Sequence, residues 1–138
     1  MRVVFITIFS LILSLKGFSR YNDQAIVRLR AELKSAPDTM VGKIYSKLFN
    51  EFYSNSAFDS AKAVAEEGIQ RGRDLEDKKF LSTAMVWSGI IEFERGNYDD
   101  ALAIYIEALK IKEEIKDLKG EASLLLNMAG IYYEQKHH

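Results

Sequence analysis

Side chains that could catalyse a reaction or bind a metal ion are few in this sequence, and their spacing does not favour either role. Histidine occurs only as His137 and His138, the last two residues. Adjacent residues on a helix point about 100° apart, so this pair would chelate a metal ion poorly. The sequence leaves open whether the two are native turn residues or a tag remnant. Cysteine is absent, which removes disulfides, thiol catalysis and cysteine-based zinc sites.

Carboxylates occur as adjacent pairs at positions 66–67, 99–100 and 113–114. Acid–base catalysis needs two carboxylates that converge on one pocket, whereas sequence neighbours on a helix diverge. The pairs therefore favour solvated surface, and no glycine-rich phosphate loop accompanies them. We expect no catalytic residue, no metal site and no cofactor, hence no enzyme within these residues.

Composition indicates one modest soluble domain rather than a nucleic-acid-binding protein. The chain has 138 residues, of which 48% are hydrophobic and 28% charged, and its net charge is −1. A balanced charge gives no electrostatic footprint for nucleic acid. The elements that organise this chain, rather than any reactive group, therefore carry the functional argument.

The first nineteen residues have the layout of a secretory signal peptide. Arg2 supplies a positive start, an apolar run extends from Val3 to Leu15, and Gly17 and Ser19 are small residues near a cleavage point. The run is shorter than the roughly 20 apolar residues that span a bilayer. We expect residues 1–19 to be removed and the mature chain to be exported, to the periplasm or cell envelope; an uncleaved anchor or a buried N-terminal helix is the alternative.

The remaining chain repeats itself with a period of 40 residues. "SAFDSAKAVAEEGI" (56–69) aligns with "GNYDDALAIYIEAL" (96–109), and "YSKLFNEFY" (45–53) aligns with "MVWSGIIEF" (85–93) and "LLNMAGIYY" (125–133). Apolar residues recur three and four apart in each stretch, which predicts helices with one buried face. Each unit therefore reads as a hairpin of two helices, with Asp59 or Asp99 in the opening turn of the second. Small residues seven apart, Ala61 with Gly68 and Ala101 with Ala108, predict close helix contacts.

These residues resemble the tetratricopeptide-repeat family, whose pattern is W-x2-L-G-x2-Y followed by A-x3-F. The chain reads Leu125-x2-Met128-Ala129-x2-Tyr132 and Ala101-x3-Tyr105, with Glu92 replacing the aromatic of the middle unit. The 40-residue period exceeds the usual 34 and is similar to the long-repeat variety in exported bacterial signalling proteins. The resemblance implies an all-α superhelix of antiparallel hairpins. Trp87, the one tryptophan, favours packing over a ligand platform.

The repeat fixes the expected organisation of the chain. We expect a capping helix within 20–41, whose apolar face is Ile26, Leu29 and Leu33, repeats at 42–81 and 82–121, and the first helix of a third repeat at 122–138. The face of that last helix stays apolar where a terminal repeat should face water. The sequence therefore predicts a truncated solenoid.

The resemblance implies an interaction scaffold that holds a partner's segment in the concave groove formed by the first helices. The alternative is the sensor or dimerisation region of a larger signalling protein, such as a histidine kinase, whose catalytic domain follows residue 138. The partner would be a protein or peptide, a homodimer is compatible, and a membrane would be reached only through a downstream segment. Carried onto this sequence, the groove residues are Lys43, Ser46, Asn50, Tyr53, Thr83, Val86, Ile90, Phe93, Ser123, Leu126 and Tyr133. The other possibility for the apolar members Val86, Ile90, Phe93 and Leu126 is that the N-terminal helix or another copy of the chain covers them.

Overall fold

The computed structural model describes residues 23–137, so the expected signal peptide at 1–19 lies outside the described residues. Within this range the fold is all-α and has no strand, as the periodicity predicted. The helices are α2 (Asp23–Ser35), α3 (Asp38–Tyr53), α4 (Phe58–Asp74), α5 (Lys78–Glu94), α6 (Tyr98–Glu114) and α7 (Leu118–His137). None of these helices is long and apolar enough to cross a membrane.

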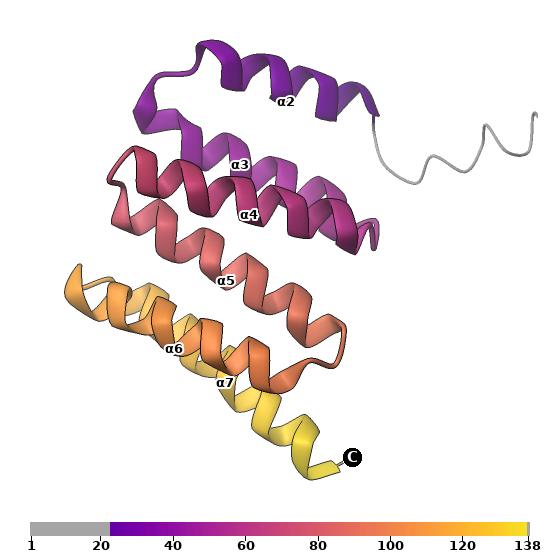
Figure 1. The fold of residues 1–138 in the computed structure, drawn as a ribbon, viewed down its shortest axis with the longest axis vertical. Coiled ribbons are helices and arrows are strands. Elements are labelled where there is room, and N and C mark those ends of the chain that lie inside the picture. Colours follow the sequence, from indigo (N-terminus) through magenta and orange to yellow (C-terminus); the bar gives the residue numbers. More distant parts are fainter. Residues whose placement is uncertain (1–22, 138) are drawn as a thin grey trace, which may run out of the picture.

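The helices stack one on the next along the long axis of the molecule, so that the first and last lie at opposite ends (Figure 1). The helices α3 and α4 form the first hairpin, α5 and α6 form the second, and α7 begins a third. The helix α2 packs on α3 through buried Leu29 and half-buried Ile26 and Leu33, which confirms the apolar face expected of the capping helix. The small residues Ala61, Gly68, Ala101 and Ala108 are all buried, as predicted.

The backbone repeats every 20 residues, although the sequence repeats every 40. Helices α3 to α7 begin at residues 38, 58, 78, 98 and 118. The residues with positive φ recur with the same interval, at Ser56, Glu76, Gly96 and Lys116. After each, a backbone N–H returns to a carbonyl five residues earlier, as in the bond from Ala57 to Phe52. This is a left-handed helix-ending turn, which satisfies the last carbonyls and reverses the chain.

Because every turn is the same, repeat units start at 38, 78 and 118, four residues before the boundaries taken from the sequence alignment. The acids Asp59 and Asp99 stand in the first turns of α4 and α6, as predicted. There they lie near the positive end of the helix dipole, although no side chain caps the amides of either helix.

Two apolar clusters fill the stack. The first joins α2, α3, α4 and part of α5 around Leu48, Phe49 and Trp87. The second joins α5, α6 and α7 around Tyr105, Leu124 and Ile131. The helix α5 contributes to both clusters, so its remaining surface faces outward between α3 and α7, where the groove is expected.

Candidate partner-binding groove

The eleven predicted groove residues all retain solvent exposure, because none of them is fully buried. The structure gathers seven of them around two cavities, and both cavities include side chains from α5. We call these the polar cavity and the apolar cavity. The polar cavity has a volume of about 360 Å³ and is lined by Thr39, Gly42, Lys43, Ser46, Asp77, Lys79, Phe80, Thr83 and Trp87. The apolar cavity has a volume of about 280 Å³ and is lined by Tyr53, Ile90, Phe93, Glu94, Tyr105, Leu126, Asn127 and Gly130.

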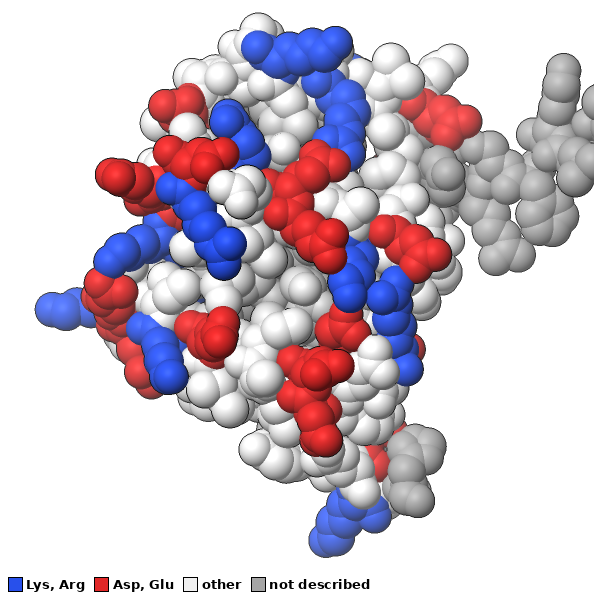
Figure 2. Space-filling model, in the orientation of Figure 1, with Lys and Arg blue, Asp and Glu red and all other residues white. Residues whose placement is uncertain are grey.

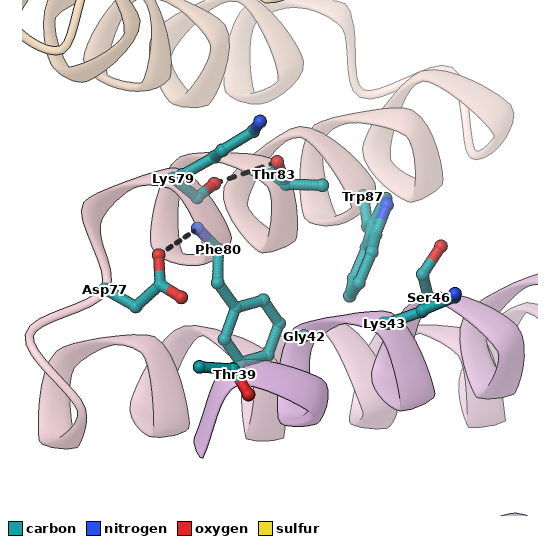
Figure 3. A pocket seen from close by; sticks show the side chains of 9 residues that line it. All are labelled: Thr39, Gly42, Lys43, Ser46, Asp77, Lys79, Phe80, Thr83 and Trp87. Atoms are coloured by element: carbon teal, nitrogen blue, oxygen red, sulfur yellow. Dashed lines mark hydrogen bonds between the residues drawn. The ribbon is translucent and has the colours of Figure 1, made fainter. Parts of the chain in front are cut away.

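The polar cavity lies between the first halves of α3 and α5 (Figure 3). Lys43 and Ser46 come from α3, and Phe80 and Trp87 come from α5. The Asp77 carboxylate accepts a hydrogen bond from the Phe80 amide at 2.9 Å, so it serves as the N-cap of α5. The two lysines of the cavity make no ion pair among the described residues. Cationic and hydroxyl groups therefore dominate what this cavity offers to a ligand.

Trp87 forms one wall of the polar cavity and was expected mainly to pack. Its ring stacks on Phe49 at 5.1 Å between centroids with an interplanar angle of 11°, and only 7% of the residue is exposed. Its indole N–H has no hydrogen-bond partner among the described residues, and none of their side-chain polar atoms is both buried and unpaired. The N–H must therefore reach the solvent, and the only cavity described beside Trp87 is the polar one. A packing residue thus carries a free donor into the groove, which the residue type alone could not reveal.

The apolar cavity lies where α3, α5 and α7 meet. Ile90 and Phe93 each present one side to the cavity and pack the other against the second cluster. Leu126 of α7 is 72% exposed and faces the same space. The Tyr53 hydroxyl donates a 2.6 Å hydrogen bond to Glu94 Oε1 at the edge. Apolar side chains rimmed by a few polar groups are typical of a binding pocket.

Burial sets the protonation of the tyrosines beside the apolar cavity. Desolvation, followed by the hydrogen bond to Glu94, raises the pKa of Tyr53 to about 12. Burial likewise raises the pKa of Tyr105 to about 12. Both phenols therefore stay neutral through the physiological range, and the only formal charge lining this cavity is the Glu94 carboxylate.

Four of the predicted groove residues lie outside these two cavities. Asn50 faces a different hollow, between α2 and α3. Val86 packs against the second cluster, and the Ser123 hydroxyl donates to the Lys119 carbonyl in its own helix. The Tyr133 ring stacks on His137 at 4.2 Å. The helix α2 covers none of the apolar groove residues, since it packs on α3 and the first cluster.

The two cavities carry charges of both signs, from Lys43, Lys79 and Asp77 at the polar cavity and from Glu94 at the apolar one. Figure 2 shows acidic and basic side chains interspersed over the face of the molecule that it draws. No group of three or more potential metal ligands occurs among residues 23–137. What the groove offers is thus local: lysines and hydroxyls at one end, apolar side chains at the other.

A comparison with protein families decides between the classes of helical repeat. The model described as the tetratricopeptide repeat matches residues 80–138, which begin at α5 and run to the end of the chain. Residues 80–138 therefore form a tetratricopeptide-repeat segment. The first hairpin lies outside the match but shares its backbone period. No curated protein matches the sequence significantly. Tetratricopeptide repeats act in general as scaffolds for protein–protein interaction, and the match supports a role of this general kind for residues 80–138.

Proposed function

We propose that this protein binds an extended or helical peptide of a partner protein along the groove of α3, α5 and α7. An apolar anchor of the peptide enters the apolar cavity beside Ile90, Phe93 and Leu126. The neighbouring polar groups of the peptide reach the polar cavity, where Lys43 can hold a carboxylate or backbone carbonyls.

The observation that carries this proposal is the unpaired indole N–H of Trp87. The ring is buried but its N–H reaches the solvent and has no protein partner among the described residues, so a ligand carbonyl can replace water there. The neighbouring apolar cavity adds a site for an aliphatic or aromatic anchor only one or two helix turns away. Together these features fit a peptide, which carries carbonyls and apolar side chains at short intervals.

The test starts from a random peptide library displayed on phage and selected on the full chain. Isothermal titration calorimetry then measures the affinity of the selected peptides, because this readout survives the loss of Trp87, the only tryptophan. Trp87→Phe keeps a ring and removes the N–H, and Leu126→Ala truncates an exposed groove residue. We expect each to weaken binding about tenfold, the loss of one good contact.

A matched control separates the groove from general effects. Val27→Ala removes a similarly exposed apolar side chain on α2, away from both cavities, and should leave binding unchanged. Peptides that bind all three variants like the parent chain would place the binding site elsewhere. Leu126 serves better than Ile90 or Phe93, because those two also pack against the second cluster and their removal would lower stability.

We also propose that the mature chain is exported, on the strength of Arg2 and the apolar run that follows it. N-terminal sequencing of periplasmic or secreted material should give a start near Arg20 or Tyr21. Intact Met1 in the cytoplasm would contradict this. That the chain is the sensor region of a larger signalling protein rests on family resemblance and stays a prediction, which sequencing the gene past the codon for His138 would test.

A further inference from the structure

The exposed large apolar side chains of the described chain concentrate on α7. Five of the eight belong to this helix: Leu118, Leu125, Leu126, Tyr132 and Tyr133. The opposite side of α7 is buried against the second cluster through Leu124 and Ile131. Leu126 lines the groove, so it belongs to the site already described. The other residues require a separate explanation.

A single exposed stripe runs down α7, about 130° around the helix from buried Leu124 and Ile131, and we call it the α7 seam. Its members are Leu118, Ala122, Leu125, Ala129, Tyr132 and Lys136, which follow one another at steps of four and three. At 100° per residue they lie within about 40° of one line, as do the core positions of a coiled coil. Large and small side chains alternate along the first five members. No charged residue occurs from Ala122 to Tyr133.

The same face is buried against a helix elsewhere in this chain. Forty residues earlier, the seam positions from 122 to 132 become Ser82, Met85, Gly89 and Glu92 of α5, all of them buried. The helix α6 packs antiparallel on α5, and the ring of Tyr105 lies against Gly89, where an added Cβ would stand 2.4 Å from it. A large side chain placed against a small one is therefore how this fold joins two helices. The α7 seam offers such a face without a covering helix among the described residues.

We propose that the α7 seam binds the α7 seam of a second copy of the chain, in an antiparallel pair whose two-fold axis crosses the seam at the level of position 127, midway between Leu125 and Ala129. In this register Leu125 faces Ala129 of the second copy, and Tyr132 faces Ala122. At the ends, Leu118 faces the aliphatic stem of Lys136. Each large residue then meets a small or flexible one.

Self-complementarity is what selects a second copy over an unrelated helix. A two-fold interface requires that if residue i contacts residue j, then j contacts i. Two pairs of positions meet this requirement, because 122 with 132 and 125 with 129 are both centred on position 127. In each pair a large side chain meets a small one. The uncharged stretch adds no like-charge repulsion where the helices cross.

The seam is about 28 Å long, because Leu118 to Lys136 is nineteen residues at about 1.5 Å each. A single helix pair of this length buries an area at or below the low end of stable interfaces, about 1,200 Å². The dimer should therefore dissociate on dilution. Sedimentation equilibrium of the full chain should show a monomer–dimer equilibrium, and Leu125→Glu should weaken it at least tenfold. Val27→Glu, at an exposed apolar position on α2, should leave it unchanged.

The register can be tested by disulfide formation, because the chain has no cysteine. A mixture of Leu125→Cys and Ala129→Cys chains should give several-fold more cross-linked dimer under mild oxidation than either variant alone. Leu125→Cys cross-linking best with itself would indicate a parallel pair and overturn the proposal. A chain that stays monomeric, or whose dimer survives Leu125→Glu, would overturn it too. So would a monomer that binds a synthetic peptide of residues 98–114, because the seam would then accept a helix of the α6 type instead.

Discussion

The first and second hairpins have the same backbone but reach it with opposite side chains. In the α3–α4 hairpin the first helix carries Phe49 and the second carries Ala65 at the equivalent place; in the α5–α6 hairpin these positions are Gly89 and Tyr105. All four are buried. The aromatic residue thus changes helices from one hairpin to the next while both positions stay buried, with the Phe49 ring stacked on Trp87 and the Tyr105 ring against Gly89. The two hairpins therefore keep a similar buried side-chain volume, although the helix that supplies the large residue differs.

A second difference involves charge. Phe52 near the end of α3 corresponds to Glu92 near the end of α5, and both are buried. The Glu92 carboxylate is held by the Lys62 ammonium and by the Asn97 amide, which donates at 2.7 Å. These two partners make the burial of a charge tolerable. A polar set in one repeat therefore does what one aromatic side chain does in the other.

The largest expected effect tests the exchange of volume. Tyr105→Ala should lower the free energy of unfolding by about 3–5 kcal/mol, because it leaves a cavity beside Gly89. Gly89→Phe should cost about 2–3 kcal/mol, because even a Cβ at Gly89 would stand 2.4 Å from the Tyr105 ring. The double variant reproduces the Phe49–Ala65 arrangement, so its cost should fall below the sum of the singles by about 2 kcal/mol. Urea unfolding followed by circular dichroism measures all three.

Gly130→Ala is the matched control for this cycle. Gly130 lies in α7, and an added Cβ there would meet nothing within 4 Å. The helix preference for alanine should then raise stability by about 1 kcal/mol. If the losses in the free energy of unfolding caused by Gly89→Phe and Tyr105→Ala simply add, a large residue on α5 does not compensate for the loss of the ring on α6.

The second prediction concerns the buried carboxylate. Glu92→Gln should lower the free energy of unfolding by about 2 kcal/mol at neutral pH. This is less than the 3–5 kcal/mol of a fully buried pair, because the Lys62 side chain is 31% exposed. The hydrogen bond from Asn97, followed by that from Lys62, lowers the pKa of Glu92 below 4.5.

The sign of the pH dependence follows from this lowered pKa. A carboxyl whose pKa is depressed in the folded state stabilises the fold above its unfolded pKa, and this stability disappears as pH falls through the folded pKa. The difference between the parent chain and Glu92→Gln should therefore shrink below about pH 4.5. Glu66→Gln, on the exposed face of α4, is the control and should change little. A difference that stays constant down to pH 3 would show that Glu92 is not held as an anion.

Sequence patterns predicted the hairpins, their small contact residues and the acids that open α4 and α6, because all of these depend on helical spacing. The 20-residue backbone period stayed hidden, since Ser56, Glu76 and Lys116 occupy a left-handed conformation that glycine usually marks. The unit boundaries shifted for the same reason.

The groove was harder to predict than the fold, because exposure depends on neighbours that the spacing does not specify. The exposure of residues such as Leu126 can be predicted from their position on the helix face. The free N–H of Trp87 does not, since the orientation of its ring is set by stacking on Phe49. The burial of Glu92 could not be read either, because a glutamate at this spacing indicates surface until Lys62 and Asn97 are seen beside it. That the groove binds a partner stays a prediction.

The smallest expected effect compares the turns of the two hairpins. Ser56 and Gly96 are equivalent and have nearly the same positive φ, 58° and 77°. A side chain in this conformation brings its Cβ close to the following carbonyl oxygen, which costs about 1 kcal/mol. Ser56→Gly should therefore raise the free energy of unfolding by about 0.5–1 kcal/mol, and Gly96→Ser should lower it by a similar amount. Since an added Cβ at Gly96 meets nothing within 4 Å, the loss would come from the backbone alone. Urea midpoints that move in the same direction for both substitutions would show that the two turns, alike in φ, are not equivalent in energy.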